Sequence, residues 1–390
     1  MIQREATKRL KELAQTFPVV TIEGPRQSGK TTLGKAVFPH FAYVNLEDRV
    51  ARELAERDER AFMEEYQPPV IIDEIQRVPS LLSAIQLEVD RRGKNGLYIL
   101  TGSHQPQLKA GISQTLAGRT ALVTLLPLSI RELEHAGLRQ QRDEYIFRGF
   151  MPAIYDRNQN PNDAYESYYR TYVERDVRQL VNLTHQREFE LFVRLLAGRI
   201  GQVVNLSGMS DEIGISANTL KEWLNVLEAG FVVFRLQPYY NNFGKRFVKS
   251  PKIYFTDVGL AAHLLEITSV EQIFRDPLAG GLFENMVVVE ALKAQLNSGK
   301  RPSLYYMRGK SGMEIDLIVE HGRELNAIEI KSAQTPDIGF FRNILHFAKT
   351  TVPVKSISAI YSGSAFTGFE GGKFVNFAQT ADLIDSYSQI

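Results

Sequence analysis

The sequence predicts an α/β protein that begins with a parallel β-sheet, and three observations support this prediction. Short apolar strands alternate with helical stretches between residues 19 and 134, a rhythm typical of βαβ units. A glycine-rich loop follows the first strand, and a later strand ends in two acids. The expected strands cover residues 19–24, 42–47, 69–75, 97–103 and 120–129.

Composition narrows the class of protein. A chain of 390 residues should hold about two to four domains. The net charge of +1 gives no global sign of a nucleic-acid partner, so any basic surface must be local. The chain has no cysteine, which excludes disulfides, thiol catalysis and cysteine-based zinc sites. No apolar run approaches ~18–20 residues, so we expect a cytoplasmic protein with no membrane partner.

A nucleotide-binding loop is the clearest motif. Residues 24–31 match the pattern GxxxxGK[ST] and lie between a β-branched strand and a helix, as that motif requires. The loop amides and the helix N-terminus would hold the phosphates of ATP, Lys30 would reach the outer phosphates, and the Thr31 hydroxyl would bind Mg²⁺. The predicted nucleotide-binding residues are Gly24, Pro25, Arg26, Gln27, Ser28, Gly29, Lys30, Thr31 and Thr32. The alternative is a glycine turn that matches by chance.

Two acids complete the predicted nucleotide site. Val70–Ile72 is an apolar run that leads into Asp73 and Glu74. Asp73 would hold the water shell of the magnesium, and Glu74 would polarise the attacking water. An acidic helix cap is the alternative. Ser103, which ends a further strand, is a candidate sensor of the γ-phosphate, although serine at a strand end is often a turn former.

Several segments together resemble one large prokaryotic family. They are GPRQSGKTTL, VIIDEIQRVPSLLSAIQLEVD, ILTGSHQ, LAGRTALVTLLPLSIREL, GFMPAIY and YVERDVRQL. The family consists of AAA-type P-loop ATPases fused to a C-terminal domain of poorly defined function, and the resemblance covers essentially the whole chain. It implies an AAA-like core over residues 1–130, a helical lid over 131–186, a winged helix over 187–255 and a nuclease-like domain over 256–390.

The resemblance also assigns a role to Arg119, which directly precedes the last strand of the core. An arginine at this place in AAA-type modules faces the nucleotide of the neighbouring subunit, where it acts as an arginine finger. That role would require a homo-oligomer. The alternative is a solvated arginine at a helix end.

The middle of the chain has the pattern of a winged helix-turn-helix. Residues 206–219 indicate a helix, a glycine-containing turn and the start of a second helix, on which Leu220, Leu224 and Leu227 form a buried face. Residues 236–255 would then form the wing. The tract 237–256 mixes lysine and arginine with tyrosine and phenylalanine and has no acid, a mixture that suits DNA contact. The alternative is a winged helix that binds protein.

Near the C-terminus, two alternating runs predict a β-hairpin with a charged face. If residues 321–324 form the loop, Glu320 pairs with Leu325, and Asp316 lies opposite Glu329. Glu314 then lies opposite Lys331, so all four charged side chains share one face. The alternative is a solvated sheet face whose charges pair across the strands.

This charged face is similar to the core of PD-(D/E)xK nucleases. The resemblance implies a divalent metal, Mg²⁺ or alternatively Mn²⁺, held by Glu284, Asp316 and Glu329. Glu329 and Lys331 would be catalytic, with Lys331 stabilising charge on the scissile phosphate. The leading Pro-Asp dipeptide of that family is missing, because Glu314-Ile315 precedes Asp316.

These features together predict a Mg²⁺-dependent ATPase that couples its nucleotide state to DNA binding and metal-dependent DNA cleavage. A second hypothesis is a non-cleaving ATPase switch whose nuclease-like fold binds only DNA or a protein partner. A third is an ATPase that remodels proteins without nucleic acid.

Overall fold

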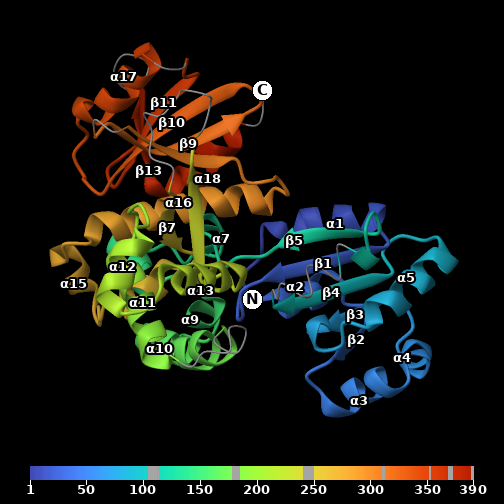
Figure 1. Cartoon of the computed structure of the whole chain (residues 1–390). Coiled ribbons are helices and arrows are strands. Elements are labelled where there is room, and N and C mark those ends of the chain that lie inside the picture. The colour runs from blue at the N-terminus through green and yellow to red at the C-terminus, as the bar shows by residue number, and fades with distance from the viewer. Residues whose placement is uncertain are drawn as a thin grey trace. The chain divides into compact units, whose positions relative to one another are not determined.

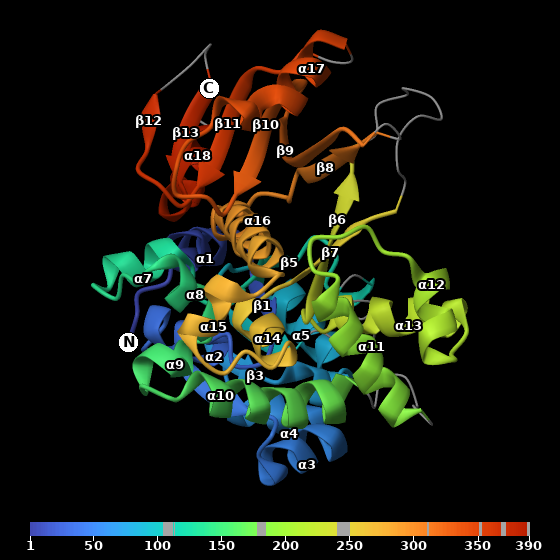
Figure 2. The same ribbon diagram turned by 90° about the vertical axis from the view of Figure 1, so that its left-hand side faces the viewer.

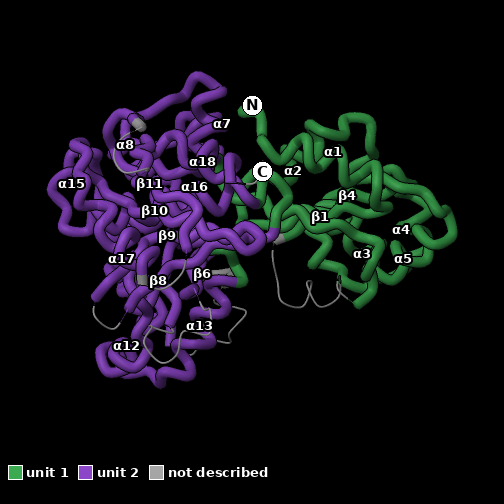
Figure 3. The backbone as a smooth tube through the Cα atoms, turned by 90° about the horizontal axis from the view of Figure 1, so that it is seen from above, with its two compact units in different colours: residues 1–128, 229–231, 296–300 green, residues 129–228, 232–295, 301–390 purple. Residues whose placement is uncertain are grey.

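The computed structural model describes residues 1–103, 112, 114–177, 185–239, 250–309, 312–350, 353–367 and 372–387. The chain divides into two compact units, drawn in two colours in Figure 3. Unit 1 comprises residues 1–128, 229–231 and 296–300, and unit 2 comprises residues 129–228, 232–295 and 301–390.

Unit 1 is built on a parallel five-stranded sheet, as the sequence predicts (Figure 1). Its order is β2-β3-β4-β1-β5, and every neighbouring pair is parallel. The strands are β1 (Val19–Gly24), β2 (Ala42–Asn45), β3 (Val70–Asp73), β4 (Tyr98–Ser103) and β5 (Thr120–Thr124). β3 is shorter than expected because the backbone leaves the strand at Glu74, where φ is 59°.

Apolar clusters cover both faces of this sheet. Ile72 and Leu100 pack in one cluster, and their neighbours Ile71 and Ile99 pack in another. A parallel sheet buried on both faces explains why its strands read as continuous apolar runs. The helices of unit 1 are α1 (Ala6–Thr16), α2 (Lys30–Val37), α3 (Arg49–Arg57), α4 (Glu59–Glu65) and α5 (Leu81–Arg92), with the 3₁₀ turn η1 (Ile75–Arg77).

Unit 2 begins with helices. The chain from Ser129 onward forms α7 (Ile130–His135), α8 (Arg142–Arg148), α9 (Pro152–Asp156), α10 (Pro161–Tyr168), the π-helical η2 (Tyr169–Val177), α11 (Gln186–Gly198), α12 (Leu206–Ile213), α13 (Ala217–Ala229), α14 (Val258–Leu264), α15 (Val270–Arg275), α16 (Ala279–Asn297), α17 (Arg342–Thr350) and α18 (Thr380–Ser386). The turns η4 (Ile338–Phe341) and η5 (Phe377–Gln379) are 3₁₀. Within the part of the chain that the structure describes, no helix combines the length and apolar character needed to cross a membrane.

A mixed eight-stranded sheet runs through unit 2 (Figure 2). Its order is β12-β13-β11-β10-β9-β8-β6-β7. The strands are β6 (Val233–Pro238), β7 (Lys252–Phe255), β8 (Leu304–Arg308), β9 (Glu314–His321), β10 (Glu324–Lys331), β11 (Ser356–Tyr361), β12 (Phe366–Thr367) and β13 (Gly372–Asn376). The sequence predicts a domain boundary between residues 255 and 256. In the structure, both sides of this position lie in unit 2, and strands from both sides belong to the same sheet.

The segment expected to form a winged helix contains α11, α12 and α13, followed by the antiparallel pair β6 and β7. Leu220, Leu224 and Leu227 are buried on α13, as their spacing predicts. The last two residues of β6, Gln237 and Pro238, also pair with β8. Most of the basic aromatic tract, residues 240–249, lies outside the described residues, and the winged helix stays a prediction.

The C-terminal hairpin corrects two expectations. Glu320 pairs with Leu325 as predicted, but His321 also pairs with Glu324, so the loop contains only Gly322 and Arg323. The alternative of a solvated charged face is wrong for Asp316 and Glu329, because both acids are buried. These two carboxyl groups therefore lie in a largely dry environment.

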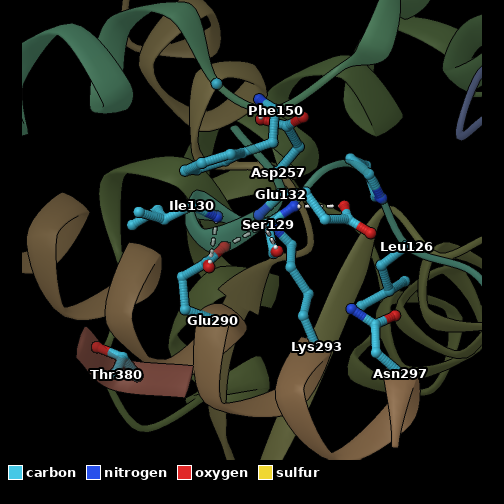
Figure 4. A network of polar contacts seen from close by, with 12 residues as sticks. Leu126, Ser129, Ile130, Glu132, Phe150, Asp257, Glu290, Lys293, Asn297 and Thr380 are labelled. Atoms are coloured by element: carbon cyan, nitrogen blue, oxygen red, sulfur yellow. Dashed lines mark hydrogen bonds and ion pairs between the residues drawn. The ribbon is translucent and has the colours of Figure 1, made fainter. Parts of the chain in front are cut away.

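A network of buried polar groups fixes the start of unit 2 (Figure 4). Ser129 and Glu132 form a capping box at the N-terminus of α7. The Ile130 amide donates to Glu290 Oε2 of α16 at 2.8 Å, and Lys293 Nζ lies 2.7 Å from Glu290 Oε1. Because Glu290 and Lys293 are both buried, their mutual neutralisation is needed to keep them there.

Asp257 anchors a second part of the same region. Its carboxylate accepts hydrogen bonds from the Tyr165 hydroxyl at 2.8 Å, the Phe150 amide at 3.1 Å and the Gly259 amide at 3.0 Å. One buried side chain thus joins α10, the segment after α8 and the start of α14.

We expect Asp257→Ala to lower the free energy of unfolding of unit 2 by about 2–4 kcal/mol, because three buried donors lose their acceptor. Thermal unfolding followed by calorimetry measures the effect. Asp211→Ala, an exposed acid of α12, is the control and should leave the transition unchanged. Equal transitions for both variants would contradict the anchoring role.

Candidate functional site

The glycine loop of unit 1 joins β1 to α2. Gly24, Gln27 and Gly29 all have positive φ, at 150°, 62° and 91°. A Cβ on Gly24 would lie 2.2 Å from the Leu125 carbonyl oxygen, so no larger residue fits there without displacing the backbone. The loop is therefore a tight turn held against the segment that follows β5.

Lys30 is folded back onto its own loop. Its Nζ donates to the Pro25 carbonyl at 2.7 Å and to the Gly24 carbonyl at 3.1 Å. Burial lowers the pKa of Lys30 to about 8, although the charges of Glu74 and Asp73 oppose this shift. The ammonium therefore lies at the loop, held by carbonyls that incoming phosphate oxygens would replace.

Asp73 is the point where the elements of the site meet. The Thr31 hydroxyl donates to its two oxygens at 2.9 and 3.1 Å, and the Tyr43 hydroxyl donates at 2.9 Å. The Thr101 hydroxyl makes a short hydrogen bond to the same carboxylate. Asp73 is only 4% exposed, and these hydroxyls satisfy it. The predicted magnesium pair, Thr31 and Asp73, is thus in direct contact.

Sequence reasoning did not single out Tyr43, and it chose Ser103 rather than Thr101 as the hydroxyl at the end of β4. Tyr43 and Thr101 are 30 and 28 positions from Asp73 in the sequence. A short sequence motif therefore cannot reveal these contacts. Burial raises the pKa of Tyr43, with Asp73 adding to the shift, so this hydroxyl stays a proton donor.

Glu74 and Ser103 lie at the same edge of the sheet. Glu74 follows β3 in a left-handed conformation, and the Gln76 side-chain amide donates to its carboxylate. Burial raises the pKa of Glu74, while Lys30 opposes the shift. Ser103 ends β4 opposite Gly24 of β1, next to the loop. The hydrolytic role of Glu74 and the sensor role of Ser103 stay predictions.

Arg119 lies at the other end of the sheet. It precedes β5, whose first residue pairs with the first residue of β1, whereas the loop follows the last residue of β1. Its guanidinium forms two hydrogen bonds with Asp90, at 2.6 and 2.9 Å. The arginine finger stays a prediction, and it would need Arg119 to leave Asp90.

The predicted C-terminal residues meet in unit 2. Lys331 Nζ lies 2.6 Å from Glu329 Oε1 and 3.5 Å from Asp316 Oδ2. The Ile330 amide donates to Asp316 Oδ2 at 2.9 Å, which fixes this carboxylate against β10. The hairpin therefore brings Asp316, Glu329 and Lys331 together, as the counting of residue pairs predicts.

Glu284 of α16 joins this cluster through a residue that the sequence did not indicate. Lys252 Nζ of β7 lies 2.9 Å from Glu284 Oε1 and 2.5 Å from Glu314 Oε1. The Tyr254 hydroxyl donates to Glu284 at 2.6 Å, and Arg308 Nε lies 3.4 Å from Glu314. A lysine within the apolar run KIYF was the available signal, because Lys252 is only 1% exposed.

We call these residues the acid–lysine cluster: Lys252, Glu284, Glu314, Asp316, Glu329 and Lys331. The protonation of its acids affects metal binding. Burial and the neighbouring Asp316 raise the pKa of Glu284 to about 6 and that of Glu329 to about 8. Glu329 Oε2 is buried and has no hydrogen-bond partner among the described residues. This donor set fits the chemistry of a divalent cation. In the arrangement observed, however, the described residues contain no group of three or more acids or histidines placed to hold one.

Comparison with known proteins places this geometry in context. The family model described as AAA domain matches residues 16–134, and two domains of unknown function, DUF8612 and DUF4143, match residues 139–271 and 279–379. The Mycobacterium tuberculosis protein Rv2008c is 31% identical over 366 residues, covering 93% of this chain and 80% of its own length. A Haemophilus influenzae protein is 22% identical and covers 95% and 96%. The Walker-type ATPase PABY2304 of Pyrococcus abyssi is 15% identical, with a TM-score of 0.43, and covers 68% of this chain and 96% of its own.

We expect ATP affinity to fall about tenfold between pH 7 and pH 9, because Lys30 loses its proton above a pKa of about 8 and must be charged to bind phosphate. ATP binding should then take up a proton at pH 9. Calorimetry in two buffers of different ionisation enthalpy measures both effects. Lys30→Arg, which stays charged, should lose the pH dependence; equal wild-type affinity at both pH values would contradict the assignment.

Proposed function

The chain belongs to the family of AAA-domain proteins that includes Rv2008c of Mycobacterium tuberculosis, and we propose that its ATPase cycle controls DNA binding and metal-dependent DNA cleavage by unit 2. The AAA domain makes the chain a P-loop ATPase. The observation that carries the proposed ATP chemistry is the direct contact of Thr31 with Asp73 beside the loop that holds Lys30.

In the proposed ATP site, the loop amides and Lys30 bind the phosphates of the nucleotide. Lys30 gives up the carbonyls of Gly24 and Pro25 to do so. Thr31 would bind Mg²⁺ and Asp73 would hold its water shell, and this Mg²⁺ would offset the charge of the β- and γ-phosphates. Tyr43 and Thr101 keep the Asp73 carboxylate in place through their hydrogen bonds.

Glu74 is the proposed general base. Its position directly after Asp73 places it at the edge of the sheet where the loop ends, and Gln76 orients its carboxylate. A carboxylate whose pKa burial has raised is a better proton acceptor than an ordinary one. Ser103, opposite Gly24, would sense whether a γ-phosphate is present.

We expect Glu74→Gln to reduce ATP turnover by about 100-fold or more while leaving ATP affinity near that of the wild type, because only the proton acceptor is lost. Phosphate release measures turnover, and calorimetry measures binding. Glu65→Gln, an exposed acid on α4, is the matched control. Undiminished turnover in the Glu74 variant would rule out this role.

DNA cleavage is the proposed chemistry of the acid–lysine cluster. Asp316 and Glu329 would hold a divalent metal with Glu284, and this metal would supply an activated water and offset charge on the scissile phosphate. Lys331, in contact with both hairpin acids, would stabilise the charge that develops on the phosphate. The basic residues of the tract 237–256 would contact the DNA backbone, with the exception of Lys252, which is buried and paired with Glu284 and Glu314.

A second candidate is the non-cleaving switch, and Lys252 favours it. This buried ammonium pairs with Glu284 and Glu314, so it offsets part of the acidic charge without a metal. Although burial alone would lower the pKa of Lys252, the charges of Glu284, Asp316 and Glu314 outweigh burial and raise it, so Lys252 remains a cation there. A cluster neutralised in this way would keep its fold and bind DNA or protein without cutting.

Incubation with plasmid and linear DNA in Mg²⁺ or Mn²⁺, with and without ATP, distinguishes the two candidates. Wild type should cut, Lys331→Ala should be at least about 100-fold slower, and Lys30→Ala should lose the response to ATP. Lys373→Ala, an exposed lysine of β13, is the control.

Two further outcomes complete the test. No cleavage by the wild type under either metal would overturn the nuclease proposal. Cleavage by Lys252→Met alone would support the switch, with Lys252 as the group that prevents metal binding. A gel shift at increasing salt shows separately whether DNA binds through its phosphates.

A further inference from the structure

Arg4, which lies two residues before the start of α1, is a buried arginine with an unusual set of contacts. Arg4 is only 8% exposed to solvent. Nη1 donates to the Ser28 carbonyl of the nucleotide loop at 2.6 Å. Nη2 donates to the Leu126 carbonyl at 2.7 Å and to the Pro127 carbonyl at 3.4 Å. One guanidinium thus joins the loop to the segment that follows β5.

The contact with Ser28 sets the direction of a loop amide. In a planar trans peptide, the C=O of one residue and the N–H of the next point in opposite directions. With the Ser28 carbonyl held towards Arg4, the Gly29 N–H must point away from Arg4, in the opposite direction within the peptide plane. Gly29 caps α2, and amides at this place are the donors that bind phosphate.

The second contact lies on the chain that leads out of unit 1. The Leu125 amide donates to the Glu23 carbonyl at 2.8 Å, so the segment after β5 is also held directly beside the start of the loop. From Pro127 the chain continues to Ser129, where the capping box of α7 begins. The loop and this connecting segment therefore share Arg4 as a common partner.

We propose that Arg4 is a positioning residue for ATP. It holds the Ser28–Gly29 peptide in the orientation that binds phosphate, and it transmits the state of the loop to residues 125–129. Arginine suits this task because its rigid fork carries several donors and stays charged. The proposal rests on ATP binding by unit 1 and is independent of any DNA activity.

The test uses the full chain carrying Arg4→Met, Arg4→Lys or the control Arg49→Met, an arginine on the exposed face of α3. Arg4→Met should weaken ATP binding about tenfold or more, because the loop is no longer preorganised. Arg4→Lys should recover part of the affinity, since one ammonium still reaches a carbonyl. Arg49→Met should bind as the wild type does.

Hydrogen exchange distinguishes positioning from a merely structural role. In the wild type, ATP should slow exchange of the amides in residues 125–132, and Arg4→Met should lose this response even at saturating ATP. Wild-type affinity and an unchanged exchange response in Arg4→Met, with only a lower unfolding temperature, would overturn the proposal.

If Arg4→Met does not fold, ATP affinity and hydrogen exchange are measured on Arg4→Lys instead. Wild-type ATP affinity together with a wild-type exchange response in Arg4→Lys would also overturn the proposal. Wild-type ATP affinity is measured first, so failure of the nucleotide site itself is recognised separately.

Discussion

The buried carboxylate of Asp73 is the constraint on which the nucleotide site depends. A charge with 4% exposure needs hydrogen-bond donors, and three hydroxyls from α2, β2 and β4 supply them. This requirement fixes the spacing between α2 and the three strands β2, β3 and β4. The parallel sheet provides that spacing, since its strands end together at one edge, where ligands of open α/β sheets bind.

In unit 2, several largely buried acids are stabilised by ion pairs with lysine side chains. Three of its acids pair with lysines: Glu290 with Lys293, Glu284 with Lys252, and Glu329 with Lys331. Paired ions inside a protein contribute little net stability, but the loss of one partner leaves a costly charge behind. The pairs therefore specify one arrangement of helices and strands more than they strengthen it.

Local pattern was sufficient to predict the parallel sheet, the nucleotide loop and the hairpin pairing, because each depends on a run or spacing of a few residues. It failed where distant segments meet. Arg4 contacts Ser28, which is 24 positions along the chain, and Leu126, which is 122 positions along. Lys252 contacts Glu284, which is 32 positions along. The hairpin loop was misjudged because His321 and Glu324 are polar but still pair. The buried state of the acids depends on covering elements that no single strand encodes.

One helix serves two of these charge pairs. α16 carries Glu284, which faces Lys252, and Glu290, which holds the first amide of α7, less than two turns apart. Each residue added to a helix rotates all later residues by about 100° around the helix axis. A single insertion between these acids would leave one of them facing away from its partner. Evolution can therefore vary the composition of this helix far more freely than its length.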